Sequence, residues 1–136
     1  MAISFPFKEE HSPIFGKIRR PVAEVYFKHT NIAIWRKATM IVDTGADYTL
    51  LPHFFASTLG IAVTKDCRVI DTQGVGGKSR VYLVKEKMHV KIGEFERKIP
   101  LGFLANDYIP PLLGRQEFFE TFRVVFEKFS PTFEET

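Results

Sequence analysis

An aspartate stands where an apolar run of this sequence meets a glycine. The run Thr39-Met40-Ile41-Val42 leads directly into Asp43-Thr44-Gly45. This pattern predicts a strand that ends in a turn at the glycine. A carboxylate at the end of a buried strand is costly unless it is hydrogen-bonded, paired with a charge or protonated. The turn is therefore either an ordinary Asx-type bend or the place where a carboxylate is held for chemistry.

Length and composition predict one compact β domain. The chain has 136 residues, of which 45% are hydrophobic and 26% charged, and this is enough for one domain with its own core. It contains 14 phenylalanines and shows no long helical pattern, which favours strands. We therefore expect an all-β, mostly antiparallel domain over residues 21–129 with one or two short helices. The spacing of the turns favours a closed, barrel-like sheet over a sandwich.

The expected elements follow from apolar alternation and from glycine and proline positions. Strands are expected over residues 22–28, 32–42, 48–51, 67–72, 80–84, 88–92, 95–99 and 122–127. Helices are expected over residues 52–60 and 115–121. In the second strand, Ile32, Ile34 and Trp35 should face inward. Residues 1–20 are expected to be an extension in which Ile3, Phe5 and Phe7 form an edge or interface strand, and residues 130–136 a tail that is loose at its end.

Several classes of function find no support in the sequence. No apolar run approaches the roughly 20 residues that span a bilayer, and the first residues do not resemble a signal peptide. The single cysteine, Cys67, gives neither an internal disulfide nor a metal cluster, and is expected to be a small buried residue. The net charge is +3 and the basic run Lys17-Ile18-Arg19-Arg20 is short. We therefore expect a cytoplasmic protein without metal, cofactor, membrane or nucleic-acid partner.

Three motifs in order along the chain carry a resemblance to a known family. They are Asp43-Thr44-Gly45-Ala46-Asp47, the glycine-rich Gly74-Val75-Gly76-Gly77 and Leu112-Leu113-Gly114-Arg115. In this combination, the sequence resembles the retropepsin-type aspartic proteases, which are the retroviral proteases and their single-domain cellular and bacterial relatives. The resemblance covers roughly residues 20–127. It implies the retropepsin fold.

The resemblance also implies a role for each motif. Asp43 is similar to the catalytic aspartate, Thr44 to the residue that braces the turn against a partner chain, and Gly45 to the glycine that lets backbone approach the substrate. The glycine-rich segment resembles the flap tip that closes over substrate. The residues implied in substrate binding are Ala46, Asp47, Tyr48, Gly74, Val75, Gly76 and Gly77. Those implied in supporting the site are Leu112, Leu113, Gly114 and Arg115, with Arg115 paired to Asp47.

The chemistry requires two such aspartates. Two carboxylates in contact share a proton, because like charges a few ångströms apart cannot both ionise cheaply. The ionised member can activate water, while the protonated member polarises the peptide carbonyl. This chain has one such turn, so the resemblance implies a homodimer that acts as an endopeptidase on extended peptides.

Other interpretations stay open at this point. The same fold could serve as a non-catalytic peptide-binding or dimerisation module. An unrelated β-barrel ligand binder is a further alternative, although it leaves Leu112-Leu113-Gly114-Arg115 unexplained. Asp71-Thr72-Gln73-Gly74 looks like a second catalytic turn, but it lacks the contiguous glycine. We interpret it as a strand that leads into the flap.

Overall fold

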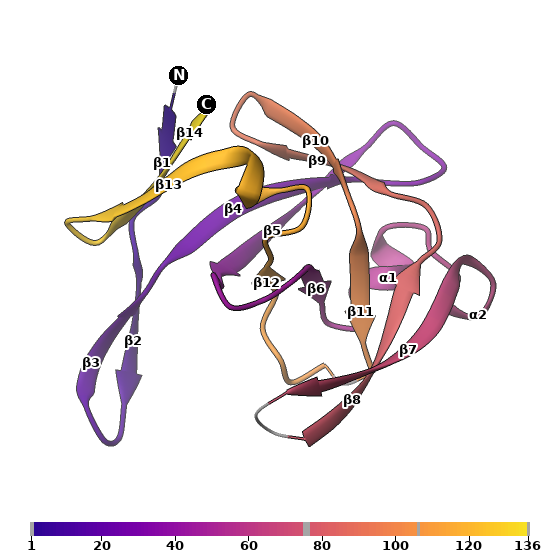
Figure 1. Ribbon diagram of the computed structural model, residues 1–136, viewed down its shortest axis with the longest axis horizontal. Coiled ribbons are helices and arrows are strands. Elements are labelled where there is room, and N and C mark those ends of the chain that lie inside the picture. The colour runs from indigo at the N-terminus through magenta and orange to yellow at the C-terminus, as the bar shows by residue number, and fades with distance from the viewer. Residues whose placement is uncertain (1, 75–76, 106, 136) are drawn as a thin grey trace.

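The computed structural model describes residues 2–74, 77–105 and 107–135, with side chains outside 72–78, and forms a mostly β structure (Figure 1). Its strands are β1 (Ala2–Ser4), β2 (Lys8–Ser12), β3 (Gly16–Arg20), β4 (Val22–Lys28), β5 (Trp35–Val42), β6 (Thr49–Leu51), β7 (Cys67–Gly74), β8 (Gly77–Val84), β9 (Met88–Ile92), β10 (Phe95–Ile99), β11 (Leu101–Leu104), β12 (Leu112–Leu113), β13 (Phe122–Glu127) and β14 (Ser130–Glu135). Its helices are α1 (Phe55–Thr58), α2 (Val63–Asp66) and the 3₁₀ turn η1 (Phe119–Thr121). The expected all-β class with few short helices is confirmed.

The main sheet is open. Its strand order is β10-β9-β4-β5-β12-β6-β11-β8-β7, and within the described residues no pairing joins β10 to β7. The closed barrel expected from the sequence is therefore wrong. The β7–β8 ladder instead continues from Cys67↔Val84 out to Gly74↔Gly77, so this end of the sheet extends away as a hairpin. Most pairs are antiparallel, and β12 with β5 and β11 with β6 are the parallel ones.

The core lies on the inner face of this sheet. Phe27, Phe103, Phe118 and Phe133 are fully buried within it. On β4, alternate residues are buried from Ala23 onward, as a strand with one solvated face requires. With Phe95, Phe119 and Phe122, seven of the 14 phenylalanines of the sequence are buried.

The second expected strand is shorter than predicted. β5 begins at Trp35, and the backbone N–H of His29 closes the preceding turn by donating to the Ile34 carbonyl at 2.9 Å. The prediction that Ile32 packs inward is wrong, because this side chain is 54% exposed in that turn. Trp35 is half-buried, and the Lys91 ammonium lies 4.3 Å from the centre of its ring.

The two chain ends meet in a separate three-stranded sheet. Its order is β1-β14-β13 (Figure 1), so β1 is the edge strand expected from Ile3. The loose C-terminal tail expected from the sequence is wrong over the described residues, because β14 pairs on both sides and Phe133 is fully buried. Ile3 also packs on the β9–β10 turn, where a Cβ added to Gly93 would lie 2.5 Å from its Cδ1 atom.

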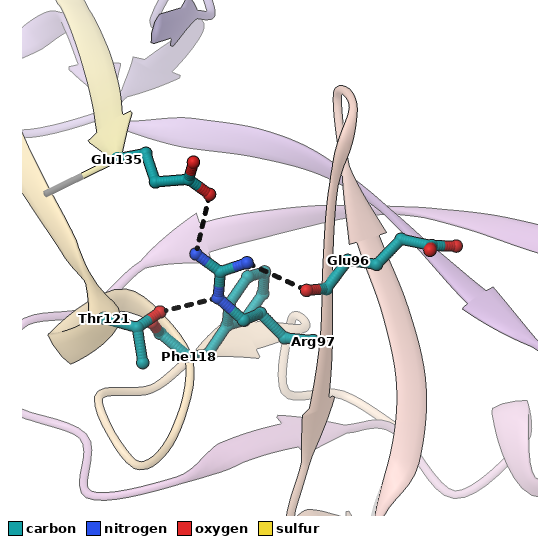
Figure 2. Close-up of polar contacts among 5 residues, drawn as sticks. All are labelled: Glu96, Arg97, Phe118, Thr121 and Glu135. Carbon is teal, nitrogen blue, oxygen red and sulfur yellow. Dashed lines mark hydrogen bonds and ion pairs between the residues drawn. The ribbon is translucent and has the colours of Figure 1, made fainter. Parts of the chain in front are cut away.

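Arg97 joins this terminal sheet to the main sheet. Figure 2 shows its guanidinium between β10, η1 and β14. It donates to the Thr121 hydroxyl at 2.9 Å and to the Glu96 carbonyl at 2.8 Å, and approaches the Glu135 carboxylate at 3.5 Å. The guanidinium also stacks over the Phe122 ring at 4.4 Å. Because the side chain is largely buried, these contacts fix the terminal sheet to β10.

Two further features differ from the expectations. The helix predicted over residues 115–121 is reduced to η1, since Glu117 has a φ of 54°, a left-handed conformation that interrupts a helix. Residues 8–20 form the hairpin β2–β3, which pairs with no other strand in the described part of the chain. Among the described residues, none of the helices could span a bilayer.

Candidate active site

The predicted turn lies at the end of β5. The Asp43 N–H donates to the Leu113 carbonyl at 3.2 Å, and the Asp43 carbonyl accepts from the Ala46 N–H at 3.1 Å. The Asp43 carboxylate accepts from the Gly45 N–H at 3.0 Å. Asp43 is half-buried and Thr44 and Gly45 are exposed. The turn is thus fixed by its backbone and faces outward, and no second carboxylate hydrogen-bonds to Asp43 within the described residues.

The short strand β12 supports this turn from below. It lies between β5 and β6, with Leu112 beside Ile41 on one side and Leu50 on the other. Leu113 is fully buried. Because β12 pairs with both flanking strands, the end of β5 and the start of β6 are held at a fixed separation. Leu112 and Leu113 thus lie where an apolar support is expected.

Gly114 permits the closest backbone contact at the site. A Cβ at this position would lie 2.3 Å from the carbonyl carbon of Tyr48 and 2.6 Å from its Cα atom. The Gly114 N–H donates to the Thr49 hydroxyl at 3.2 Å, and Thr49 is fully buried. Sequence reasoning missed Thr49. The sequence does contain a signal for it, because Thr49 is a hydroxyl residue at the start of a short, otherwise apolar strand. A buried hydroxyl there needs a hydrogen-bond partner.

Arg115 is paired with Asp47. Its guanidinium donates to the Asp47 carboxylate at 2.5 Å, and the two backbone N–H groups that follow Gly114 donate to the carbonyls of Ala46 (3.1 Å) and Asp47 (2.7 Å). The side chains are 48% and 70% exposed, so the ion pair by itself contributes little to stability. Its effect is to fix positions. Together with the two backbone hydrogen bonds, it ties residues 115 and 116, which follow β12, to Ala46 and Asp47, which follow the Asp43 turn.

Tyr48 lies inward of this pair. Its ring packs near Gly102, where an added Cβ would be 3.5 Å from Tyr48 Cε2. Its hydroxyl is buried, and none of the residues that the structure describes forms a hydrogen bond with it. Burial, and to a lesser extent the charge of Asp47, raises the pKa of the Tyr48 phenol. The side chain is thus neutral and directed into the sheet beside the site.

The glycine-rich segment forms the end of a hairpin. Gly74 and Gly77 pair across β7 and β8, while Val75 and Gly76 lie outside the described residues. Asp71 lies on β7 opposite Arg80, so the interpretation of residues 71–74 as a strand is confirmed. In Figure 1, this hairpin extends away from the body of the sheet.

The described residues offer two further features to consider as sites, a hollow in the surface and the Cys67 thiol. A hollow of about 620 Å³ is lined by residues of the β4–β5 turn, the α1–α2 segment and the β8–β9 connection, among them Lys28, His29, Lys65 and Lys85. It contains none of the residues around Asp43. Cys67 is buried, and burial raises the pKa of its thiol, which disfavours the nucleophilic thiolate. Among the described residues, no group of three His, Cys, Asp or Glu side chains could hold a metal ion.

Thr49 gives a test of the support beneath the turn. We expect Thr49→Val to lower the free energy of unfolding by about 1–3 kcal/mol, because it leaves the Gly114 N–H without its acceptor in a buried place. Thr49→Ser is the matched control, since it keeps the hydroxyl and loses a methyl group. Urea denaturation of the two variants measures the difference. Equal stability of the valine and serine variants would contradict this role for the hydroxyl.

The chain is similar to known proteins in its sequence and in its fold. A protein-family model described as "Aspartyl protease" matches residues 35–116, which is more than half of the chain. No curated protein sequence matches significantly. Among solved structures, a retropepsin-like aspartic protease from Rickettsia conorii has a TM-score of 0.66 at 21% identity, covering 97% of this chain and 98% of its own. The chain therefore belongs to the aspartyl protease family and has the retropepsin-like fold.

Proposed function

We propose that the protein is an aspartic endopeptidase that hydrolyses peptide bonds in extended polypeptide segments. The observation that carries the proposal is the outward-facing Asp43 turn, fixed between β5, β12 and β6. Membership of the aspartyl protease family supports the same chemistry. A peptidase of this kind needs no metal or cofactor, because two carboxylates and one water supply the acid, the base and the nucleophile.

The mechanism uses one Asp43 from each of two chains. At the two-fold axis of a homodimer, an isologous contact would bring the two turns together. The pair would share one proton, so that one carboxylate takes a proton from water as it attacks the peptide carbon. The other would donate its proton to the carbonyl oxygen. As the tetrahedral intermediate collapses, the carboxyl that took the proton of water would give it to the departing nitrogen, and a hydroxyl of the intermediate would return a proton to the other carboxylate. Thr44, exposed beside Asp43, is the residue that would brace one turn against the other.

Substrate would bind as an added strand between the turn and the β7–β8 hairpin. On the turn side, Ala46, Asp47 and Tyr48 follow the catalytic residues. On the other side, Gly74 to Gly77 would close over the peptide as a flap. The β7 strand lies at the end of the main sheet, and β8 pairs with β11 only over Val81 to Leu83, so in the described residues no further strand pairs with the end of this hairpin.

Digestion of an unfolded protein or a peptide library tests this proposal. We expect cleavage that is blocked by a statine-containing peptide, which mimics the tetrahedral intermediate, and that is unaffected by thiol-alkylating reagents. Specific activity should fall on dilution, since the site is shared between chains and dissociation destroys it. Cleavage that persists unchanged with the statine peptide bound would contradict the aspartic mechanism.

The alternative is a peptide-binding or dimerisation module on the same fold. It predicts that peptides bind to the protein and are recovered intact. Product analysis by mass spectrometry after long incubation at high protein concentration separates the two functions.

A further inference from the structure

The hairpin β2–β3 has no role in the site described above. It lies outside residues 35–116, the part matched by the aspartyl protease family model. Figure 1 shows it projecting from the body, on the side where the connection from β5 to β6, which carries the Asp43 turn, also lies. A two-stranded hairpin alone in water is marginally stable at best. Contacts with the rest of the chain must therefore hold this hairpin in place, and its exposed end calls for a function.

Both faces of the hairpin carry ion pairs, and the half-buried Ile18, opposite Glu10, is the one large apolar side chain within its two strands. Glu9 pairs with Lys17 and Arg19, at 3.7 and 3.5 Å, on one face. Glu10 pairs with Arg20 and Lys8, at 2.6 and 3.5 Å, on the other, and these cations, Arg20 first, lower the pKa of Glu10. Neither face is thus built to cover a core of its own chain, since a sheet face that packs inward is apolar.

The exposed large apolar residues of the hairpin lie at its tip. Ile14 is 82% exposed and Phe15 is 78% exposed, side by side in the turn. Their backbone is well fixed, because the Ser12 hydroxyl accepts from both of their N–H groups at 3.2 Å. Gly16 closes the turn with a φ of +73°, a conformation that glycine adopts without strain. Two large apolar side chains are therefore presented to solvent in a defined geometry.

The base of the hairpin is joined to the terminal sheet. The Phe7 N–H donates to the Phe129 carbonyl at 2.9 Å, and the two rings meet edge to face at 6.1 Å. The Arg19 guanidinium lies 4.4 Å from the centre of the same Phe129 ring. Phe129 and Phe126 remain 59% and 45% exposed at this end of β13–β14. The hairpin that carries the apolar tip is thus anchored to the sheet that the two chain ends form.

We propose that β2–β3 is a dimerisation arm whose Ile14–Phe15 tip packs on a second copy of this chain. A second copy is the occupant because the Asp43 site is half of a dyad, and the arm projects on the side of that turn. Five-residue strands reach about 17 Å beyond their base, which is enough to cross onto a neighbouring subunit. The arm thus adds apolar contact outside the catalytic turns. This inference rests on the proposed function for the identity of the partner.

The test compares dimer dissociation in the wild type and in the double variant Ile14→Ser, Phe15→Ser. We expect the dissociation constant, measured by analytical ultracentrifugation, to rise at least about tenfold, as loss of two buried apolar side chains implies. Thermal unfolding of the monomer should be unchanged, because both side chains are exposed within one chain. Ile32→Ser is the matched control, since Ile32 is an equally apolar, 54% exposed residue on the β4–β5 turn.

A photo-crosslinking amino acid at position 15 gives a second measurement. We expect a covalent dimer on irradiation, and none from the same group at position 32. If the wild type is an active dimer and the double variant has the same dissociation constant, the proposed role of the arm is wrong and the proposed protease function is retained. If the double variant dissociates more readily than the wild type but neither form cleaves peptides, the role of the arm is supported and the proposed protease function is wrong. A wild type that stays monomeric at all concentrations overturns both.

Discussion

Replacing Asp43 with asparagine is expected to abolish peptide cleavage. The change removes the group that takes a proton from water and the group that donates one to the carbonyl, in both chains at once. General acid–base catalysis is worth about 10²–10⁴-fold, so we expect a loss near the upper end of that range. The amide keeps the shape of the carboxylate and can still accept from the Gly45 N–H, so folding and dimerisation should be retained. Initial rates with a fluorogenic peptide measure the loss.

Asp71→Asn is the matched control for this prediction. Asp71 begins the segment that resembles a second catalytic turn, but it lies within β7 opposite Arg80. We expect this variant to keep nearly full activity. Comparable losses in the two variants would contradict the assignment of catalysis to Asp43.

Mixing the wild type with Asp43→Asn tests whether the site is shared. In an equal mixture that exchanges subunits freely, about a quarter of the dimers contain two wild-type chains. Cleavage should then fall to about one quarter of that given by the wild type at the same total concentration, because a dyad needs both carboxylates. A fall to about one half would show that each chain acts alone.

The parts of the fold set by local pattern were predictable. β9 and β10 alternate buried and exposed residues around the Gly93 turn, and both were predicted with their observed bounds. The Asp43 turn was predicted for the same reason. The Arg115–Asp47 pair was expected from the family resemblance, because nothing local in the sequence brings these two residues together.

The parts set by pairing between distant segments were not predictable. β14 has few apolar residues, and its Phe133 is buried because Ile3 and Val124 pair beside it. The prediction of a closed sheet was wrong for a related reason, because the residue pattern of a strand does not indicate which strand lies next to it. The helix over residues 115–121 failed because the loop is tied to Ala46 and Asp47, and these tertiary hydrogen bonds outweigh local helix propensity.

Gly114→Ala is expected to have the largest effect on stability. The new methyl would lie 2.3 Å from the Tyr48 carbonyl carbon, far inside contact distance. The clash is with backbone, so no side-chain rotation relieves it. Leu112 is paired on both sides, and the Gly114 N–H is bonded to Thr49, so neither strand can retreat alone. We expect a loss of about 3 kcal/mol or more in the free energy of unfolding, at the top of the range for overpacking, measured by urea denaturation.

Gly45→Ala is the control, because it adds the same methyl to the Asp43 turn, which is hydrogen-bonded to the residue before Gly114. Its Cβ would meet Asp43 Oδ1 at 3.4 Å, an ordinary contact, so the free energy of unfolding should change by less than about 1 kcal/mol. Equal destabilisation by the two alanines would mean that the glycines serve chain flexibility and not close approach. If Gly114→Ala alone is destabilising, the residual folded protein should also cleave poorly, because the methyl pushes β6 away from β12. The Asp43 turn connects β5 to β6, so a support that holds the fold also holds the carboxylate in place.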